Sequence, residues 1–249
     1  MKQTLKQLQQ LKGKRRISML TAYNCPVARS IEQAGILTIL VGDSVGMVEM
    51  GFSSTRDVTM EHMVYHIEAV RRGAPNTHII GDLPHLTYEN VDDAVANAKR
   101  IIAAGADSVK LEGPYFDAVK AIVNEGIEVV AHVGLTPQKA TNFKKVGKSQ
   151  AEAQQIIDES VELEKAGAGM IVIEHVPAEL GEKLTQTLNI PTIGIGAGGE
   201  TDGQVLVIND ALGIGDYWPP FSKQYAHVSD TILKVATQYR EEVETKQYP

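Results

Sequence analysis

The chain has 249 residues, of which 43% are hydrophobic and 22% are charged. This composition is sufficient for one sizeable hydrophobic core and excludes a disordered or fibrous protein. The formal net charge is -7, and no long run of basic residues accompanies it. A nucleic-acid-binding domain is therefore not expected, and small molecules are the expected partners.

The cysteine count and the hydropathy pattern predict a cytoplasmic protein. Cys25 is the one cysteine, so neither an internal disulfide nor a thiolate metal site is expected. Residues 1–16 are polar and basic, without the apolar core of a secretory signal. No apolar run approaches the roughly 18 residues that a membrane span requires. We therefore expect no membrane association.

Short β-branched runs alternate with helical patterns along almost the whole chain. Such alternation predicts a parallel sheet with crossover helices. Eight runs are candidate strands, at residues 17–20, 38–41, 78–81, 108–111, 128–132, 170–173, 192–195 and 204–208.

The helices between these runs have recognisable ends. Thr59 and Asn90 are suited to cap helix N-termini, and Gly35, Gly105 and Gly167 each stand where a helix would stop. Eight βα units in a chain of this length indicate a closed (β/α)8 TIM barrel, an α/β fold, and we assign residues 1–249 to a single domain.

The two ends of the chain add one helix each. Residues 5–11 are apolar at positions 5, 8 and 11, which predicts a short N-terminal helix that plugs the bottom of the barrel, packs on a neighbour, or frays as a chain end. The last predicted helix spans about 222–244 and ends in a charged, solvated tail.

Acidic side chains follow three adjacent predicted strands. Active sites of such barrels form at the carboxyl ends of the strands, where Asp43, Asp82 and Glu112 stand. Three carboxylates in close proximity repel one another unless a cation or proton intervenes. Oxygen ligands without cysteine favour Mg²⁺ or Mn²⁺ over zinc. The alternative is that these acids only cap the following helices.

Two further polar side chains belong to the same rim. Lys110 lies two residues before Glu112 on one strand, so both point to the same face. Lys110 could balance a substrate carboxylate, form a Schiff base, or simply pair with a neighbouring acid. His132 could donate a hydrogen bond or a proton to substrate, or be a satisfied interior histidine.

Glu174 and Glu179 flank Pro177 after the sixth predicted strand, and one of them is a candidate base. Glu179 could instead complement the dipole of the next helix. The glycine-rich run 194–199 is a weak phosphate-binding signal, and it could equally permit close backbone approach.

Several motifs stand out between about residues 16 and 228. They include MLTAY, ILVGDSVGM, GDLP, VKLEG, HVGLTPQ, VPAEL, PTIGIGAG and DGQVL, at 19–23, 39–47, 81–84, 109–113, 132–138, 176–180, 191–198 and 202–206. Together these motifs resemble one known family, ketopantoate hydroxymethyltransferase (3-methyl-2-oxobutanoate hydroxymethyltransferase).

The resemblance implies a (β/α)8 barrel enzyme of pantothenate and coenzyme A biosynthesis. It would transfer a one-carbon unit from 5,10-methylenetetrahydrofolate to 3-methyl-2-oxobutanoate through a Mg²⁺-stabilised enolate, giving 2-dehydropantoate. Asp43 and Asp82 would bind Mg²⁺, with Glu112 in the metal site directly or through water. Members of the family form homodecamers, so a homo-oligomer is expected.

The resemblance also implies roles for the other candidates. Ser44 and Lys110 would contact the keto acid beside Asp43 and Asp82, with His132 nearby, and Glu179 would accept the proton. Three departures from the family pattern stand out: Asn24 where aspartate is frequent, His175 where a small residue or cysteine is frequent, and a shortened stretch at 141–148.

Without the resemblance, two other classes of function fit the acids. One is a metal-dependent lyase that cleaves a carbon-carbon bond in a related 2-oxo acid. The other is a barrel that serves only as a binding module.

Overall fold

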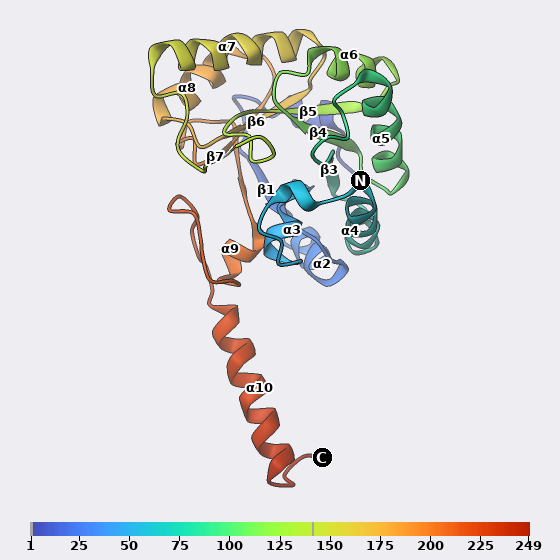
Figure 1. Ribbon diagram of the computed structural model, residues 1–249, viewed down its shortest axis with the longest axis vertical. Helices are drawn as coiled ribbons and strands as arrows, with labels where there is room; N and C mark the ends of the chain where they lie inside the picture. Colours follow the sequence, from blue (N-terminus) through green and yellow to red (C-terminus); the bar gives the residue numbers. More distant parts are fainter. Residues whose placement is uncertain (1, 141) are drawn as a thin grey trace. The chain divides into compact units, whose positions relative to one another are not determined.

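Eight parallel strands form a closed barrel in the order of the sequence (Figure 1). This order confirms the predicted (β/α)8 barrel. The computed structural model describes residues 2–140 and 142–249. Its strands are β1 (Ile17–Thr21), β2 (Thr38–Val41), β3 (His78–Asp82), β4 (Ser108–Glu112), β5 (Glu128–Gly134), β6 (Met170–Glu174), β7 (Thr192–Ile195) and β8 (Gly203–Leu206).

The strand register decides which side chains become neighbours at the carboxyl rim of the barrel. Asp82 of β3 lies opposite Lys110 of β4. Glu112 of β4 lies opposite His132 of β5. Because alternate residues of a strand point to one face, these four side chains share the barrel interior.

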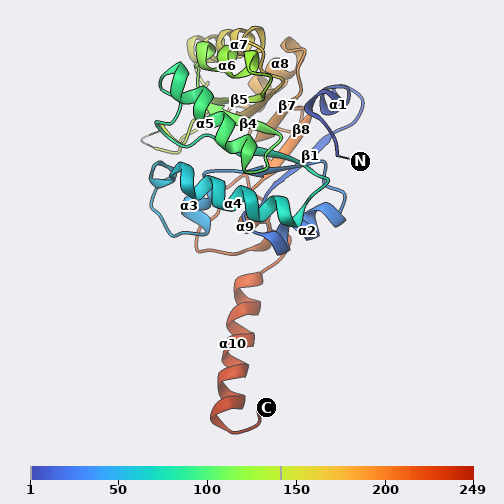
Figure 2. The ribbon, with the colours of Figure 1, turned by 90° about the vertical axis from the view of Figure 1, so that its right-hand side faces the viewer.

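Helices surround the barrel on its outer side (Figure 2). Thr59 and Asn90 cap α4 and α5 as predicted, each accepting a backbone N–H of the first turn. The elements of this layer and its loops are α2 (Cys25–Gln33), α3 (Val45–Val48), η1 (Thr55–Asp57), α4 (Met60–Gly73), α5 (Val91–Ala103), α6 (Phe116–Asn124), α7 (Gln150–Lys165) and α8 (Ala178–Thr187).

The N-terminal helix α1 (Leu5–Gln9) plugs the end of the barrel away from the carboxyl rim. Leu5 and Leu8 are fully buried in one cluster with interior strand residues such as Ile17, Met170 and Val205. Thr4 and Gln7 form a capping box that fixes the first turn. Of the predicted arrangements of this segment, the plug is therefore confirmed.

The chain divides into two compact units, one up to Val205 and the other Leu206–Pro249. The second unit contains α9 (Ile208–Leu212) and α10 (Val228–Glu244). The predicted strand 204–208 was too long, because Ile208 already begins α9. The last helix begins later than residue 222, after a segment with two consecutive prolines. The assignment of residues 1–249 to one domain stays a prediction.

No helix in the described part of the chain has the length and hydropathy of a membrane span.

Candidate active site

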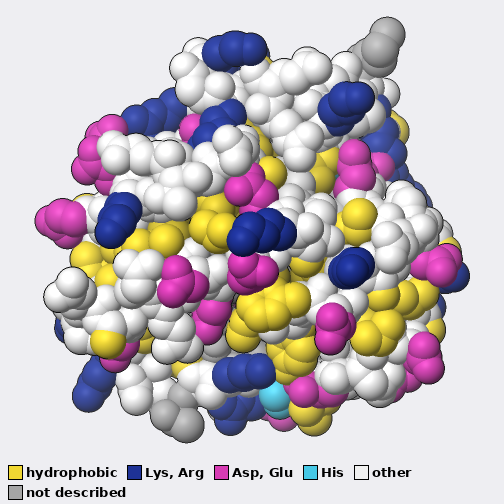
Figure 3. All heavy atoms as spheres, turned by 90° about the horizontal axis from the view of Figure 1, so that it is seen from above, with side chains coloured by type: hydrophobic (Ala, Val, Ile, Leu, Met, Phe, Trp, Pro, Cys, Tyr) yellow, Lys and Arg dark blue, Asp and Glu magenta, His cyan; other side chains and the backbone are white. Residues whose placement is uncertain are grey.

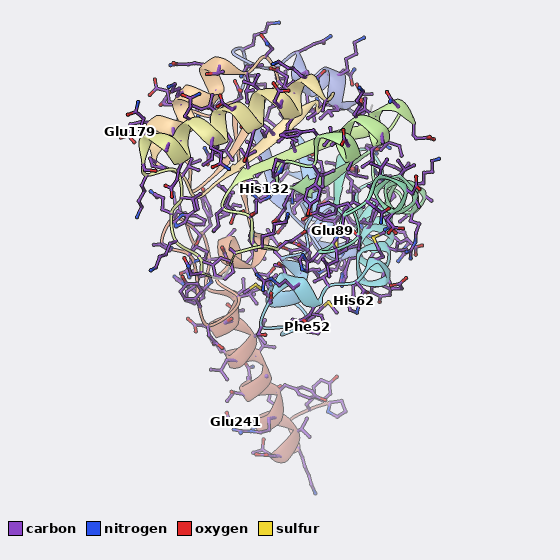
Figure 4. The ribbon with its side chains drawn as sticks, turned by 45° about the horizontal axis from the view of Figure 1, so that its top comes forward. Phe52, His62, Glu89, His132, Glu179 and Glu241 are labelled. Atoms are coloured by element: carbon purple, nitrogen blue, oxygen red, sulfur yellow. The ribbon has the colours of Figure 1, made fainter. Side chains whose placement is uncertain are left out.

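The carboxyl rim of the barrel holds a group of buried charged side chains, which we call the rim cluster. It consists of Asp43, Asp82, Lys110, Glu112 and His132, each at most 4% exposed. Figure 4 shows His132 inside the ring of strands. The structure thus brings together five of the residues that the sequence placed at strand ends.

Opposite charges alternate along the rim cluster. The Lys110 ammonium lies 3.0 Å from Asp82 Oδ1 and 3.8 Å from Glu112 Oε1. The imidazole of His132 lies between two carboxylates, with Nδ1 3.3 Å from Glu112 Oε1 and Nε2 3.3 Å from Glu174 Oε2. Two of these contacts, Lys110 with Asp82 and His132 with Glu112, join residues that the strand register places opposite each other.

The two cationic groups stay charged at neutral pH. Burial lowers the pKa of Lys110, but Asp82, Glu112 and Asp43 outweigh it and raise the pKa above its usual value. Burial likewise opposes protonation of His132, yet Glu112 and Glu174 raise its pKa to about 9. A neutral amine suited to Schiff-base chemistry is therefore disfavoured at Lys110.

The carboxyl groups differ in their proton affinity. Burial, followed by the charges of Glu112 and Asp82, raises the pKa of Asp43 well above its usual value. Burial also raises the pKa of Glu112, but its neighbours His132 and Lys110 more than compensate and the net shift is downward. Glu112 therefore ionises more readily than Asp43, and a further cation would stabilise the ionised form of Asp43.

Gln138 connects two acids of the rim cluster, and the sequence reasoning did not select it as a site residue. Its side chain is 0% exposed. Its amide nitrogen donates to Asp43 Oδ2 at 2.8 Å and to the Leu83 carbonyl at 3.0 Å. Its backbone N–H donates to Glu112 Oε2 at 3.1 Å, and its amide oxygen accepts the Tyr88 hydroxyl hydrogen bond. Every polar atom of this side chain is therefore satisfied.

A tyrosine–serine pair and an arginine complete the support of the site. Tyr23 and Ser44 share a hydrogen bond of 2.8 Å between their hydroxyl groups. The guanidinium of Arg56 donates to the carbonyls of Gln138 at 2.9 Å and Ala140 at 2.8 Å. In the sequence, Gln138 is marked only as the last residue of the family motif HVGLTPQ.

Glu179 does not join the rim cluster. It is exposed in the first turn of α8, and Figure 4 shows it at the outer edge of the barrel, apart from His132. Glu174, the other candidate base, does reach the cluster through His132. The role of Glu179 as proton acceptor stays a prediction.

Two glycines permit close approaches at the rim. A Cβ on Gly42 would lie 3.1 Å from Ser44 Oγ and 3.4 Å from Asp82 Oδ2, so glycine keeps space open beside the acids. Gly198, in the predicted phosphate-binding run, has a positive φ, and its Cβ would lie 2.6 Å from the Ala178 side chain. That run therefore packs tightly against α8.

The oxygen donors of the rim cluster fit a hard divalent cation. Among the described residues, no group of three His, Cys, Asp or Glu side chains has the spacing of a preformed metal site. Mg²⁺ commonly takes only one or two carboxylates and completes its shell with water and substrate oxygens. Asp82 Oδ1 is buried and lies 3.0 Å from the Lys110 ammonium. A two-carboxylate site at Asp43 and Asp82 is therefore compatible with this geometry.

The sequence of the chain matches one family along nearly its full length. The family model for ketopantoate hydroxymethyltransferase covers residues 2–249. The chain belongs to this family. A 3-methyl-2-oxobutanoate hydroxymethyltransferase of Moorella thermoacetica is 47% identical to this family member, over 99% of the chain and 95% of the relative. The enzyme of the same name from Bacillus subtilis is 45% identical, over 100% of the chain and 93% of the relative.

Two solved structures with the same fold are more distant in sequence than these relatives. A 2,3-dimethylmalate lyase of the PEP mutase/isocitrate lyase superfamily has a TM-score of 0.66 at 14% identity, over 100% of this chain and 90% of the other. A phosphonopyruvate hydrolase has a TM-score of 0.65 at 14% identity, over 98% and 88%. These likenesses support the barrel architecture alone.

Proposed function

We propose that this chain is a 3-methyl-2-oxobutanoate hydroxymethyltransferase. It would transfer the one-carbon unit of 5,10-methylenetetrahydrofolate to 3-methyl-2-oxobutanoate and release 2-dehydropantoate. Its curated relatives carry that name, for example at 47% identity over 99% of the chain. The observation that carries the proposal is the rim cluster, because it offers buried cations for an anionic keto acid beside oxygen ligands for a metal ion.

The proposed metal ion is Mg²⁺, held by Asp43 and Asp82, with Glu112 contributing directly or through water. When bound, it would supply positive charge that stabilises negative charge on the keto oxygen of the substrate. The raised pKa of Asp43 supports this placement, since burial and the neighbouring Glu112 and Asp82 make its negative charge costly without a cation.

The other residues of the site bind and orient the keto acid. Lys110 is charged and buried, so its ammonium is suited to pair with the substrate carboxylate. Protonated His132 is suited to donate a hydrogen bond to a substrate oxygen. Ser44, held by the hydroxyl of Tyr23, would add a third hydrogen bond.

The reaction needs a base for the C3 proton of the keto acid, and we assign this role to Glu179. The C3 proton passes to the Glu179 carboxylate, and C3 attacks the folate methylene, so that a carbon-carbon bond forms as the first carbon-nitrogen bond breaks. Water then bonds through its oxygen to the methylene carbon as the second carbon-nitrogen bond breaks, which gives the hydroxymethyl group of 2-dehydropantoate. The C3 proton and one proton of the water go to the two nitrogens of tetrahydrofolate. Because Glu179 is exposed in this structure, its role requires that a movement of α8 or the position of the substrate bring the Glu179 carboxylate to the C3 proton.

The test is formation of 2-dehydropantoate by the purified protein, followed by mass spectrometry with and without Mg²⁺. Asp43→Asn is expected to abolish product while the circular dichroism spectrum stays that of the wild type. Cleavage of a 2-oxo acid without any folate would instead support the lyase. Unchanged ligand binding and no turnover in both proteins would support a binding module.

We further propose that the enzyme acts in the cytoplasm as a homo-oligomer, with the decamer as the specific form. The helix α10 supports assembly, because none of its residues is buried and it exposes five apolar side chains, Ile232, Leu233, Val235, Tyr239 and Val243. Light scattering of the purified protein measures the assembly directly, and a monomer at micromolar concentration would refute it.

A further inference from the structure

Residues 139–148, which we call the lysine segment, form the most cationic stretch near the active site. The segment contains four lysines, Lys139, Lys144, Lys145 and Lys148, and residues 129–151 contain no aspartate or glutamate. The whole chain has a net charge of -7. On the face that carries α6 and α7, by contrast, basic and acidic side chains are interspersed (Figure 3).

Both ends of the lysine segment are attached to the active site. At its start, Arg56 holds the carbonyl of Ala140, next to the buried Gln138 that contacts Asp43. Near its end, the Val146 N–H donates to the carbonyl of His175 at 3.1 Å. His175 directly follows Glu174, whose carboxylate contacts His132. The lysines between and beside these attachments therefore belong to the mouth of the barrel.

The charges of the segment are available to a ligand. Lys144, Lys145 and Lys148 are exposed, and none forms a salt bridge with an acid in the part of the chain that the structure describes. Their positive field reaches the rim: burial lowers the pKa of His175, and Lys145 and Lys148 lower it further. Lys139 differs from these three lysines because its charge already has a partner: its ammonium lies 4.3 Å from the centre of the Tyr115 ring.

We propose that the lysine segment binds the carboxylate-bearing tail of the folate co-substrate. The inference rests on the proposed function, because the folate methylene must reach a keto acid held at the rim cluster. The p-aminobenzoyl-glutamate end of a folate presents an aromatic ring followed by carboxylates, and each added γ-glutamyl residue contributes one more. The segment offers the complementary groups, namely three unpaired lysines and the Phe143 side chain, which is 57% exposed.

The keto acid itself is a poorer occupant of the segment. It is small, and the rim cluster already offers its carboxylate the ammonium of Lys110, which is 3% exposed. The lysine segment lies in solvent, where a long and flexible polyanion gains several weak contacts at once. Affinity for the tail should therefore grow with the number of its carboxylates and fall with salt.

The experiment compares the mono- and triglutamate forms of 5,10-methylenetetrahydrofolate as co-substrates. In the wild-type protein, the triglutamate form is expected to have the lower KM, and 0.5 M KCl should remove the difference. The variant Lys144→Gln/Lys145→Gln/Lys148→Gln should raise the KM for the triglutamate form by about tenfold, since each exposed ion pair contributes modestly. The KM for the keto acid should not change.

A matched variant controls for the loss of three charges. Lys6→Gln/Lys14→Gln/Lys120→Gln removes the same number of exposed lysines outside the lysine segment, and its KM for either folate should equal that of the wild type. Circular dichroism checks that both variants fold.

The outcomes separate this inference from the proposed function. If the wild type forms 2-dehydropantoate and the segment variant shows the wild-type ratio of the two KM values, the inference is wrong and the function stands. If the wild type forms no product, titration calorimetry with p-aminobenzoyl-triglutamate still tests the segment. Binding that the segment variant loses and the control variant keeps supports the inference, and any other pattern overturns it.

Discussion

The substitution Gln138→Leu tests how much the buried hydrogen bonds of the rim cluster contribute to stability. Leucine has similar volume but leaves Asp43 Oδ2 and the Leu83 carbonyl without their amide donor, and the Tyr88 hydroxyl without its amide acceptor. Each buried polar group left unsatisfied costs about 1–3 kcal/mol, and partial relaxation reduces the sum. We expect the free energy of unfolding to fall by about 4 kcal/mol, a large share of the ~5–15 kcal/mol typical of a domain.

The substitution Gln138→Glu separates charge from shape. It retains an oxygen acceptor for Tyr88 but places a second carboxyl oxygen where the amide nitrogen lies 2.8 Å from Asp43 Oδ2. Two carboxyl groups at this distance share one proton, so the folded state binds more protons than the unfolded state. The stability of this variant should therefore fall as pH rises above about 4 and recover in acid.

Urea denaturation followed by far-UV circular dichroism measures both effects. The control Gln155→Leu changes an exposed glutamine on α7 and should alter the free energy of unfolding by less than about 0.5 kcal/mol. If Gln138→Leu behaves like this control, the hydrogen bonds of Gln138 do not support the rim cluster and the reasoning is refuted.

Three further predictions concern other parts of the barrel unit. Lys110→Met should raise the KM for the keto acid by about 100-fold or more, because it removes the buried ammonium, and a KM within twofold of wild type would contradict the role. With chelator present, the charge of His132 should stabilise the fold fully below about pH 6.5, and this effect should be lost as the pH rises through the folded pKa of about 9. The free energy of unfolding should decrease by about 3 kcal/mol over this range, and the decrease should be absent in His132→Gln. Leu8→Ala should lower the unfolding free energy by about 2–5 kcal/mol without changing either KM, because Leu8 is 0% exposed in the plug of the barrel.

The architecture was predictable because each strand of a (β/α)8 barrel has a local signature. Runs of β-branched residues mark the strands, and capping residues such as Thr59 mark the helices between them. The barrel also dictates where its active site lies, so Asp43 and Asp82 could be selected from their position after two strands. The prediction of strand 204–208 was wrong at its C-terminal end, because Ile208 begins a helix that local hydropathy did not distinguish from a strand.

The pairings inside the site were not predictable from the same patterns. The contact of Lys110 with Asp82 depends on strand register, which no single strand encodes. The sequence alone indicates a possible ion pair of Lys110 with a neighbouring acid and does not single out Asp82. Gln138 was missed because a buried amide on a loop has no periodicity and no charge to attract notice. Its importance emerges only when the loop after β5 folds back onto two acids.

The central claim is that the rim cluster binds the keto acid and enables loss of its C3 proton. The most direct measurement is exchange of that hydrogen for deuterium in 3-methyl-2-oxobutanoate, followed by NMR in D₂O with Mg²⁺ and without folate. We predict exchange with the wild-type protein and a rate at least about 100-fold lower with Asp82→Asn, because the substitution removes one buried charge of the cluster. Exchange at the wild-type rate in Asp82→Asn, or none in a wild-type protein that forms 2-dehydropantoate, would contradict the claim.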